Sequence, residues 1–321
     1  MSTNSRSTSG LHHVTAISGP AQENLDFYVG VLGMRLVKRS VNQDDPGTYH
    51  LFYADAEGRA GTDLTFFPWA HLAPARPGHG LSEEVSLAVP PESLDFWWQR
   101  LERYGARVGK LETRFGESTL PVVDPHGLKL ALVASPSAMK RPFTPWDESA
   151  VLQERQIRGL HTARLVERDV LPTEKFLVES MGFRGVGTED GWLRFAVGEG
   201  GSGQFIDLRE APEARRGAWG TGSIHHLAWR VADDEQHLAL RSQIDDAGLH
   251  PTPVIDRFWF RSVYFREPGG VVFELATDGP GFTVDEPAEH LGESLVLPPW
   301  LEASRPEIEA GLPKLVMPSG T

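Results

Sequence analysis

The stretch Leu240-Arg241-Ser242-Gln243-Ile244-Asp245-Asp246-Ala247-Gly248 has the pattern of an amphipathic helix that ends at a glycine. Apolar residues stand one, four and eight positions before Gly248, which is the spacing of a helix that buries one face. A glycine just past the last turn can adopt the left-handed conformation that ends a helix. Three other stretches share the pattern and end at Gly33, Gly105 and Gly182, although Glu174 interrupts the apolar stripe of the third. The four stretches predict four helices in equivalent positions.

Strand-like runs surround each predicted helix in the same order. A short apolar or alternating run precedes each helix, at residues 13–17, 85–89, 162–165 and 226–231. Strand-like stretches follow the helix, and the last of them starts at a glycine, at residues 61–66, 127–132, 203–208 and 270–275. The fifth residue of that last run lies 32, 26, 25 and 26 residues beyond the helix-ending glycine in the four copies. Such regular spacing indicates four copies of one structural module.

The length of 321 residues suggests about two domains. Residues 136–158 are rich in proline and charge and fit none of the four modules, so we predict a linker there. Modules 1 and 2 would then form an N-terminal domain at residues 1–135, and modules 3 and 4 a C-terminal domain at residues 159–280. The stretch 281–321 is rich in proline and glutamate, and we expect it to pack on the surface as a tail.

The composition excludes several classes of protein. With 31 basic and 44 acidic residues the net charge is −13, which argues against a nucleic-acid or anionic-membrane surface. The absence of cysteine excludes disulfides, thiolate catalysis, zinc–thiolate sites and iron–sulfur clusters, so any metal must be held by His, Asp or Glu. The first nine residues lack the apolar region of a signal peptide, and no apolar run approaches the roughly 20 residues of a spanning helix. We therefore expect a soluble, cytoplasmic protein.

Two histidine pairs stand in similar contexts, Gly10-Leu11-His12-His13-Val14 and Ser223-Ile224-His225-His226-Leu227, and Glu274 lies in the last strand-like run. Two imidazoles and a carboxylate on strands suit a three-ligand Fe(II) or Mn(II) site, which leaves positions open for substrate and oxygen. At the corresponding strand positions of modules 2 and 3, the only residue of a metal-binding type is Asp207. A single carboxylate cannot hold a metal alone. We predict one site, where modules 1 and 4 face each other. The alternative is that these histidines are hydrogen-bonded core residues.

The chain resembles the vicinal-oxygen-chelate superfamily, which includes glyoxalase I, bleomycin-resistance proteins and extradiol ring-cleaving dioxygenases. It is most similar to the two-domain hydroquinone-type ring-cleaving dioxygenases, over nearly its whole length. The matching motifs are Leu11-His12-His13, Thr113-Arg114-Phe115-Gly116, Ile224-His225-His226, Pro268-Gly269-Gly270 and Leu291-Gly292-Glu293. The resemblance implies an α+β fold in which four βαβββ modules form two domains of paired, curved mixed sheets.

The resemblance also implies that His13, His226 and Glu274 are the metal ligands, because the ligands of this group occupy these positions. Fe(II) is the expected ion, and Mn(II) would suit the same ligands. Glyoxalase I-type sites have a fourth ligand, a carboxylate in the last strand of the first module, where this chain has Thr65. A three-ligand site leaves room for an aromatic diol and O₂ together, which favours a dioxygenase.

Four further residues are implied as catalytic by the resemblance: His12, His225, Arg257 and Tyr264. A neutral histidine can transfer protons near physiological pH, a tyrosine can donate a hydrogen bond to a substrate oxygen, and an arginine can stabilise its negative charge. Adjacent residues of a strand point to opposite faces, so His12 and His13 can both face the site only where the strand twists or bulges. His12 and His225 could instead support or pack against the ligands.

The main hypothesis is a non-haem Fe(II)-dependent, extradiol-type ring-cleaving dioxygenase that acts on hydroquinone-like or catechol-like aromatic diols with O₂. One alternative is a glyoxalase-like metal-dependent lyase or isomerase, which would turn over without oxygen. Another is a non-catalytic protein that sequesters a small molecule without any metal. Exposed sheet edges between the two halves would also allow a homodimer.

Overall fold

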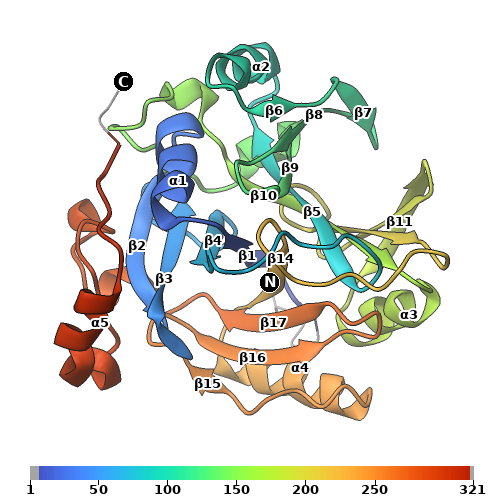
Figure 1. The fold of residues 1–321 in the computed structure, drawn as a ribbon. Coiled ribbons are helices and arrows are strands. Elements are labelled where there is room, and N and C mark those ends of the chain that lie inside the picture. The colour runs from blue at the N-terminus through green and yellow to red at the C-terminus, as the bar shows by residue number, and fades with distance from the viewer. Residues whose placement is uncertain (1–6, 319–321) are drawn as a thin grey trace.

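Two mixed β-sheets form the protein: one joins the first and last modules of the chain, and the other joins the two modules between them (Figure 1). The computed structural model describes residues 7–318. The first sheet has the strand order β15-β16-β17-β14-β1-β4-β3-β2. Its strands come from module 1 and module 4: β1 (Leu11–Ser18), β2 (Arg35–Asn42), β3 (Asp45–Ala54), β4 (Asp63–Pro68), β14 (Ile224–Val231), β15 (Ile255–Asp256), β16 (Arg261–Arg266) and β17 (Val272–Thr277).

The second sheet joins modules 2 and 3 in the order β11-β12-β13-β10-β5-β9-β8-β6, with β7 paired to β8. Its strands are β5 (Leu81–Val89), β6 (Arg107–Val108), β7 (Glu112–Arg114), β8 (Glu117–Val123), β9 (Lys129–Ala134), β10 (Gly159–Glu167), β11 (Arg184–Glu189), β12 (Trp192–Ala196) and β13 (Phe205–Glu210). In each module the first strand pairs in parallel with the last, which confirms the four-module α+β fold. Both sheets combine modules from either side of residues 136–158. The sheets therefore do not separate the two predicted domains, and the domain limits stay a prediction.

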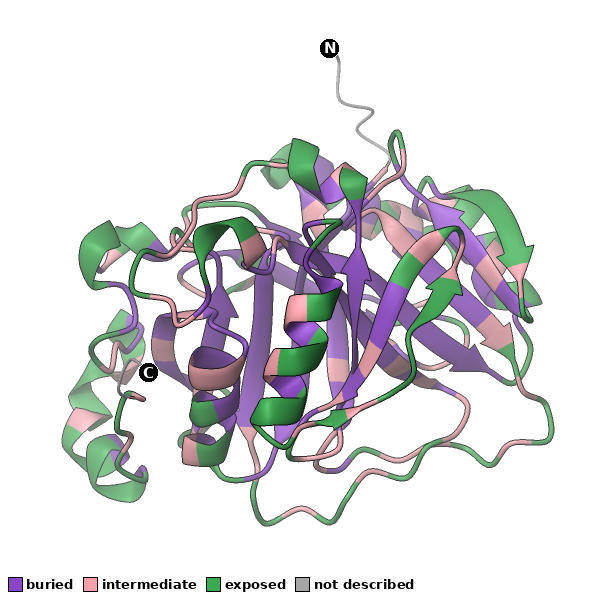
Figure 2. Cartoon of the chain, turned by 90° about the horizontal axis from the view of Figure 1, so that it is seen from above, coloured by how far each residue is buried: buried purple, intermediate pink, exposed green. Residues whose placement is uncertain are grey.

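One helix follows the first strand of each module, as the glycine pattern predicts. These helices are α1 (Ala21–Leu25), which continues as a π-helical turn (Asp26–Val31), α2 (Leu94–Arg103), α3 (Leu171–Ser180) and α4 (Asp234–Asp246). Gly33, Gly105, Gly182 and Gly248 follow them with φ of 68°, 70°, 77° and 79°, the left-handed conformation expected at a helix end. The helices bury one face and expose the other (Figure 2). None of the helices within residues 7–318 is long and apolar enough to cross a membrane.

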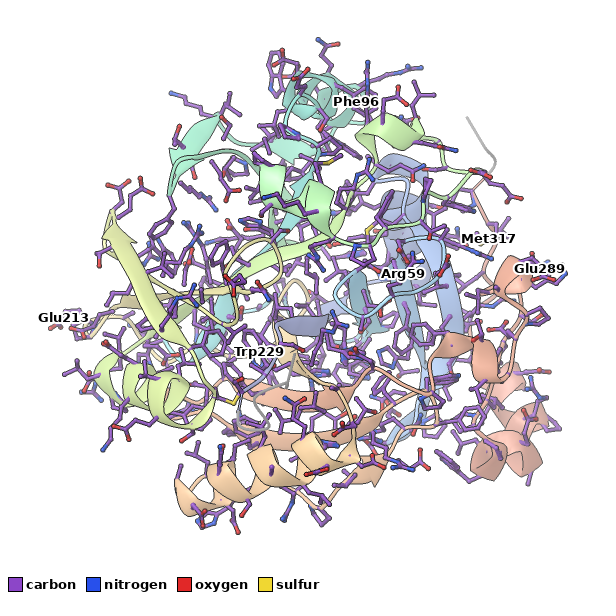
Figure 3. The ribbon with its side chains drawn as sticks, turned by 180° about the vertical axis from the view of Figure 1, so that it is seen from behind. Arg59, Phe96, Glu213, Trp229, Glu289 and Met317 are labelled. Carbon is purple, nitrogen blue, oxygen red and sulfur yellow. The ribbon has the colours of Figure 1, made fainter. Side chains whose placement is uncertain are left out.

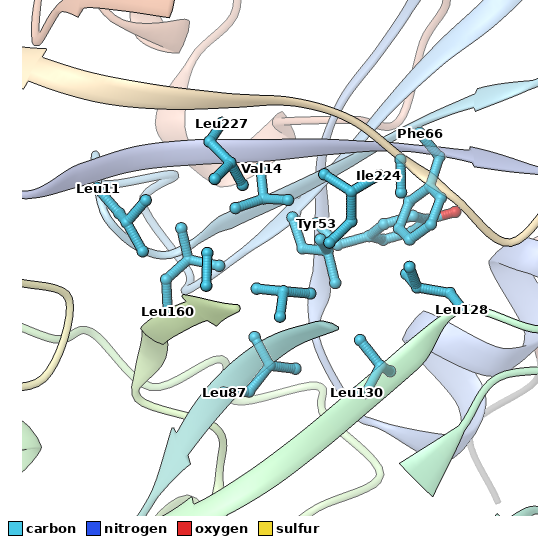
Figure 4. Close-up of a cluster of buried hydrophobic side chains, with 14 of the residues drawn as sticks. Leu11, Val14, Tyr53, Phe66, Leu87, Leu128, Leu130, Leu160, Ile224 and Leu227 are labelled. Carbon is cyan, nitrogen blue, oxygen red and sulfur yellow. The ribbon is translucent and has the colours of Figure 1, made fainter. Parts of the chain in front are cut away.

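A hydrophobic layer joins the two sheets. Leu11 and Leu227 of the first sheet and Leu87, Leu130 and Leu160 of the second are all buried in one cluster (Figure 4). Trp229 is fully buried in the same cluster and lies in the interior in Figure 3, where Glu213 and Glu289 lie at the periphery. Each such buried apolar side chain contributes about 1.5–3 kcal/mol, so this layer holds the first sheet in place on the second.

The tail lies beside the first sheet and contains the short helix α5 (Arg305–Gly311), next to β2 and β3 in Figure 1. Leu295 forms a β-bridge with Arg39 of β2. Lys38, also on β2, is completely buried beneath the tail. Its ammonium group donates to the carbonyl of Phe282 at 3.1 Å and to the carboxylate of Asp285 at 2.7 Å, and it also pairs with Glu286.

A buried pair of glutamates lies where the two sheets meet. Glu167, at the end of β10, is fully buried, and neither of its carboxyl oxygens has a hydrogen-bond partner among the described residues. It packs so closely against Gly269 that a Cβ atom there would lie 1.5 Å from Oε2 of Glu167. Glu267, in contrast, accepts hydrogen bonds from Thr173 and from two backbone N–H groups. Burial, together with the charge of Glu267, raises the pKa of Glu167 to about 9.

The raised pKa of Glu167 predicts that Glu167→Gln stabilises the protein increasingly as the pH rises. The folded protein keeps a proton on Glu167 that the unfolded chain loses above about pH 4.3, so wild-type stability falls from there until Glu167 ionises in the folded state. Glutamine cannot ionise, and the gain should grow by up to about 1.4 kcal/mol per pH unit. Urea unfolding at pH 6, 7, 8 and 9 measures it, with the exposed Glu213→Gln as control. Parallel stability curves for wild type and Glu167→Gln would contradict the prediction.

Candidate metal centre

Both histidine pairs lie on β-bulges in the adjacent strands β1 and β14. From Leu11 to His13, β1 advances two residues while β14 advances one, and from Ile224 to His226 the roles are reversed. The residues flanking each pair are three apart and yet share the hydrophobic layer: Leu11 with Val14, and Ile224 with Leu227 (Figure 4). The bulges therefore place both histidines of each pair away from that layer. Two adjacent residues of a strand can face one site only where the strand twists or bulges, as expected from the sequence.

His13, His226 and Glu274 form a compact buried cluster at this point. Nε2 of His13 lies 3.2 Å from Nε2 of His226, and these two atoms lie 3.2 and 3.0 Å from Oε2 of Glu274. Among the described residues, this is the one group of three or more His, Asp and Glu side chains whose ligand atoms converge closely enough to hold a metal ion. Modules 1 and 4 thus bring together the three predicted ligands.

The donor atoms in this cluster fit a cation. Oε2 of Glu274 is buried and has no hydrogen bond of acceptable geometry among the described residues, although both imidazole nitrogens lie close to it. Burial alone would raise the pKa of Glu274, but the two histidines hold the pKa well below its ordinary value, so the carboxylate is charged. A buried anion that faces two imidazole nitrogens is what a divalent ion needs for charge compensation.

His12 fixes the tautomer of His13. Nε2 of His12 lies 3.1 Å from the carbonyl oxygen of Thr277, which can only accept, so this nitrogen donates. Burial and then the neighbouring His13 lower the pKa of His12 to about 3, which keeps His12 neutral. Its Nδ1 therefore accepts from Nδ1 of His13 at 2.9 Å, and Nε2 of His13 presents a lone pair to the site.

His225 makes the equivalent contact with His226, at 2.8 Å between the Nδ1 atoms. Burial and then His226 lower the pKa of His225 to about 3, so His225 is also neutral. Its ring stacks on Trp219 with a centroid distance of 4.4 Å. His12 and His225 thus lie behind His13 and His226, and neither lines the cavity described below.

A small cavity of about 40 Å³ opens at His13 and His226. Its walls are largely aromatic, and two of the predicted catalytic residues, Arg257 and Tyr264, lie on it. The lining residues are His13, Asn42, Gln43, Asp44, His50, Phe52, Phe67, His226, Arg257, Trp259, Phe260 and Tyr264. Aromatic walls with placed polar groups, beside a cluster of metal-ligand type, suit a small planar ligand.

The two polar residues of module 4 on this wall keep fixed protonation states. Burial and then Glu274 raise the pKa of Tyr264 above its ordinary value, so its hydroxyl stays protonated and can donate. Burial alone would lower the pKa of Arg257, but Tyr264 and Asp44 raise it overall, so the guanidinium stays charged. Arg257 pairs with Asp44 at 2.8 Å, across the mouth of the cavity from module 1.

Sequence reasoning missed three residues around the site. Ser262 on β16 donates to Oε1 of Glu274 at 2.5 Å, Asp44 holds Arg257, and His50 lines the cavity from β3. A polar residue alternating with apolar ones, such as His50 beside Leu51 and Phe52, is the one local signal for any of them. The other two depend on contacts between distant strands.

The hydrogen bond from Ser262 predicts that Ser262→Ala weakens metal binding by about 10- to 100-fold. The serine hydroxyl holds Oε1, which directs Oε2 of Glu274 toward the two histidines. Anaerobic titration with Fe(II) or Mn(II) measures the affinity. Ser40, also fully buried on the first sheet but without a partner for its hydroxyl among the described residues, gives the matched control Ser40→Ala. Equal affinities for the two variants would show that the hydroxyl of Ser262 is not needed.

The equivalent position of the second sheet carries no such site. Asp207 stands in the register of Glu274, but Arg194 pairs with it at 2.8 and 3.0 Å and Arg164 at 3.2 Å. The guanidinium groups take the place that a cation would occupy, as expected for a lone carboxylate. His161, which corresponds to His12, is buried and lies 3.1 Å from Glu117.

The fold and this site define the class: the chain belongs to the Glyoxalase/Bleomycin resistance protein/Dioxygenase superfamily, whose family model matches residues 10–132. It is 43% identical over 307 residues to the "Putative ring-cleaving dioxygenase MhqO" of Bacillus subtilis, which covers 96% of either chain. It is 33% identical over 309 residues to the "Chlorohydroquinone/hydroquinone 1,2-dioxygenase" of Sphingobium indicum, covering 93% of this chain and 94% of that one.

Solved structures agree with the fold. The crystal structure of a "putative dioxygenase from Bacillus subtilis" matches with a TM-score of 0.90 at 42% identity, over 98% of this chain and 99% of that one. Glyoxalase I from Zea mays matches with a TM-score of 0.60 at 14% identity, over 84% of this chain and 92% of that one. The maize enzyme shares the arrangement of modules, and at this identity the likeness concerns the fold alone.

Proposed function

We propose that this protein is an Fe(II)-dependent, extradiol-type ring-cleaving dioxygenase that acts on hydroquinone-like aromatic diols with O₂. The observation that carries the proposal is the buried cluster of His13, His226 and Glu274 at an aromatic-walled cavity. The names of the relatives, which include ring-cleaving and hydroquinone dioxygenases, support the same reaction class.

The types of the three side chains favour iron or manganese, since two imidazoles and one carboxylate are the usual ligand set of non-haem Fe(II) sites. Their ligand atoms lie 3.0, 3.2 and 3.2 Å apart, so one divalent ion could contact all three. When bound, Fe(II) would supply open coordination positions and exchange electrons with dioxygen. Mn(II) would suit the same ligands.

The cavity residues have distinct roles in this proposal. The cation of Arg257 favours the ionised form of the substrate phenol, and the protonated Tyr264 donates a hydrogen bond to a substrate oxygen. Phe52, Trp259 and Phe260 provide apolar surface for an aromatic ring and keep water away from it. His12 holds the imidazole of His13 in the required tautomer, and His225 orients the imidazole of His226.

Oxygen uptake tests this proposal. The protein would be loaded anaerobically with Fe(II) and given hydroquinone, methylhydroquinone and catechol in turn in an oxygen electrode. We expect uptake that requires both iron and a diol, with hydroquinones turned over faster than catechol. Turnover of a substrate without oxygen consumption would instead indicate a lyase or isomerase. Tight binding of a small molecule by metal-free protein, without turnover, would indicate a sequestering protein.

A further inference from the structure

His50 lies on the wall of the cavity that module 1 provides. In the register of the first sheet, Phe52 of β3 pairs with Thr65, and Tyr264 of β16 pairs with Glu274. Phe52 and Tyr264 therefore occupy equivalent places on opposite sides of the site, and both line the cavity. His50, two residues before Phe52, shares its face of the strand and lines the cavity as well.

The ring of His50 is held rigidly. Its Nε2 bonds to Oγ1 of Thr65 at 2.9 Å, and that oxygen bonds to Oγ1 of Thr15 at 2.7 Å. Both threonines are fully buried. The imidazole packs against Phe52 and Phe67, with centroid distances of 3.9 and 4.5 Å. A side chain anchored by a buried hydrogen-bond chain and two aromatic rings has one orientation, as substrate recognition requires.

The second ring nitrogen of His50 remains free. Nδ1 bonds to no described residue, and it is not among the buried polar atoms that lack a partner, so it is open to the cavity. Burial, and then the neighbouring His13 and His226, lower the pKa of His50 well below its ordinary value, so the ring is neutral and presents one hydrogen-bonding nitrogen.

Three other polar side chains that module 1 contributes to the cavity each make at least one hydrogen bond or ion pair. Gln43 donates to the carbonyl of Arg257 at 2.9 Å, Asp44 pairs with the Arg257 guanidinium, and Asn42 accepts from the backbone N–H of Asp44 at 2.9 Å. Nδ1 of His50 is thus an unengaged polar atom that lies between the aromatic rings of Phe52 and Phe67.

We propose that His50 binds the second hydroxyl of the aromatic diol, the one that does not face the metal ligands, and so selects diols over monophenols. This inference rests on the proposed function. One substrate oxygen must face the triad of His13, His226 and Glu274. In the proposed function Arg257 and Tyr264, on the module 4 side of the cavity, act on that oxygen. The second hydroxyl then needs a hydrogen-bond partner elsewhere, since an unpaired hydroxyl in an apolar wall is strongly disfavoured.

Ligand binding by the Fe(II)-loaded protein without oxygen tests the role of His50. Hydroquinone and phenol, which lacks the second hydroxyl, would be titrated anaerobically into wild type, His50→Phe and His50→Gln. Phenylalanine keeps the packing on Phe52 and Phe67, and glutamine keeps a hydrogen-bonding group. We expect His50→Phe to weaken hydroquinone binding by about tenfold or more while phenol binding changes by less than about threefold. His50→Gln should recover part of the loss.

Two results would overturn this inference. If His50→Phe weakened both ligands equally, the role of His50 would be structural, and if it weakened neither, His50 would not touch the substrate. Iron content and the unfolding midpoint, measured on each variant, separate a damaged site from a lost contact. Failure of wild type to bind hydroquinone at all would overturn the proposed function together with this inference, and wild-type binding with an unselective His50→Phe would overturn the inference alone.

Discussion

Glu274→Gln is expected to abolish metal binding, and with it oxygen uptake. Glu274 supplies the one negative charge among the three proposed ligands, and its Oε2 lies 3.0 and 3.2 Å from the two imidazole nitrogens. The neutral amide removes that charge, and a divalent ion would then face neutral groups alone in a buried site. Because loss of a residue that only supports a ligand costs about 10- to 100-fold in affinity, loss of the anionic ligand should exceed that range.

Metal content after dialysis and calorimetric titration with Fe(II) or Mn(II) measure the effect of Glu274→Gln. Circular dichroism would check that the sheet is intact. Glu117 offers a matched control, because it also lies beside a buried histidine, 3.1 Å from His161, but in the second sheet. Glu117→Gln should keep a full equivalent of metal. If Glu274→Gln bound the metal as tightly as Glu117→Gln does, the three-ligand assignment would be wrong.

Lys38→Met is expected to destabilise the protein by about 3–5 kcal/mol, the usual cost of removing one partner from a buried ion pair. Lys38 is completely buried between β2 and the tail, and its ammonium group serves Asp285, Glu286 and the carbonyl of Phe282. Methionine fills much of the space but leaves two carboxylates without their cation. Asp285 also accepts from the indole of Trp259 at 2.9 Å, so the change should loosen one wall of the cavity.

Urea unfolding measures the loss in Lys38→Met, and limited proteolysis shows whether the tail is released. Lys129→Met is the control, because Lys129 is half exposed and pairs with Glu83 on the surface, where such pairs contribute about 0–1 kcal/mol. Adding Asp285→Asn and Glu286→Gln to Lys38→Met should recover part of the loss. A cost as small as that of Lys129→Met would mean that Lys38 does not anchor the tail.

The repeat could be predicted from the sequence because it rests on local features. A glycine that ends a helix and a strand-like run that starts at a glycine recur at similar spacing. The structure has helices and parallel strand pairs there, with each last strand beginning two residues after its glycine. His13, His226 and Glu274 followed from the same registers together with the family resemblance. The sequence indicated that each histidine pair needs a bulge, but it could not show where the bulges lie. Their positions, at His12 and His225, depend on how β1 pairs with β14.

Contacts between distant segments could not be predicted. Lys38 looks like an ordinary strand lysine, and its partners Asp285 and Glu286 lie about 250 residues further along the chain. Ser262 and Glu274 meet across two antiparallel strands, so their hydrogen bond depends on the register of β16 with β17. The π-helical turn at Asp26–Val31 likewise has no signal in the apolar stripe, which fits an ordinary helix.

Isotope labelling with ¹⁸O₂ tests the central claim most directly. Protein loaded with Fe(II) would be given hydroquinone under labelled oxygen, and the product reduced at once, before a carbonyl group exchanges its oxygen with water. Mass spectrometry would then count the labelled atoms. The proposed function predicts a ring-opened product that carries both atoms of one O₂ molecule, and Glu274→Gln should form none of it. An oxidised but unopened ring, or a ring-opened product without label, would contradict the assignment of this chain as a ring-cleaving dioxygenase.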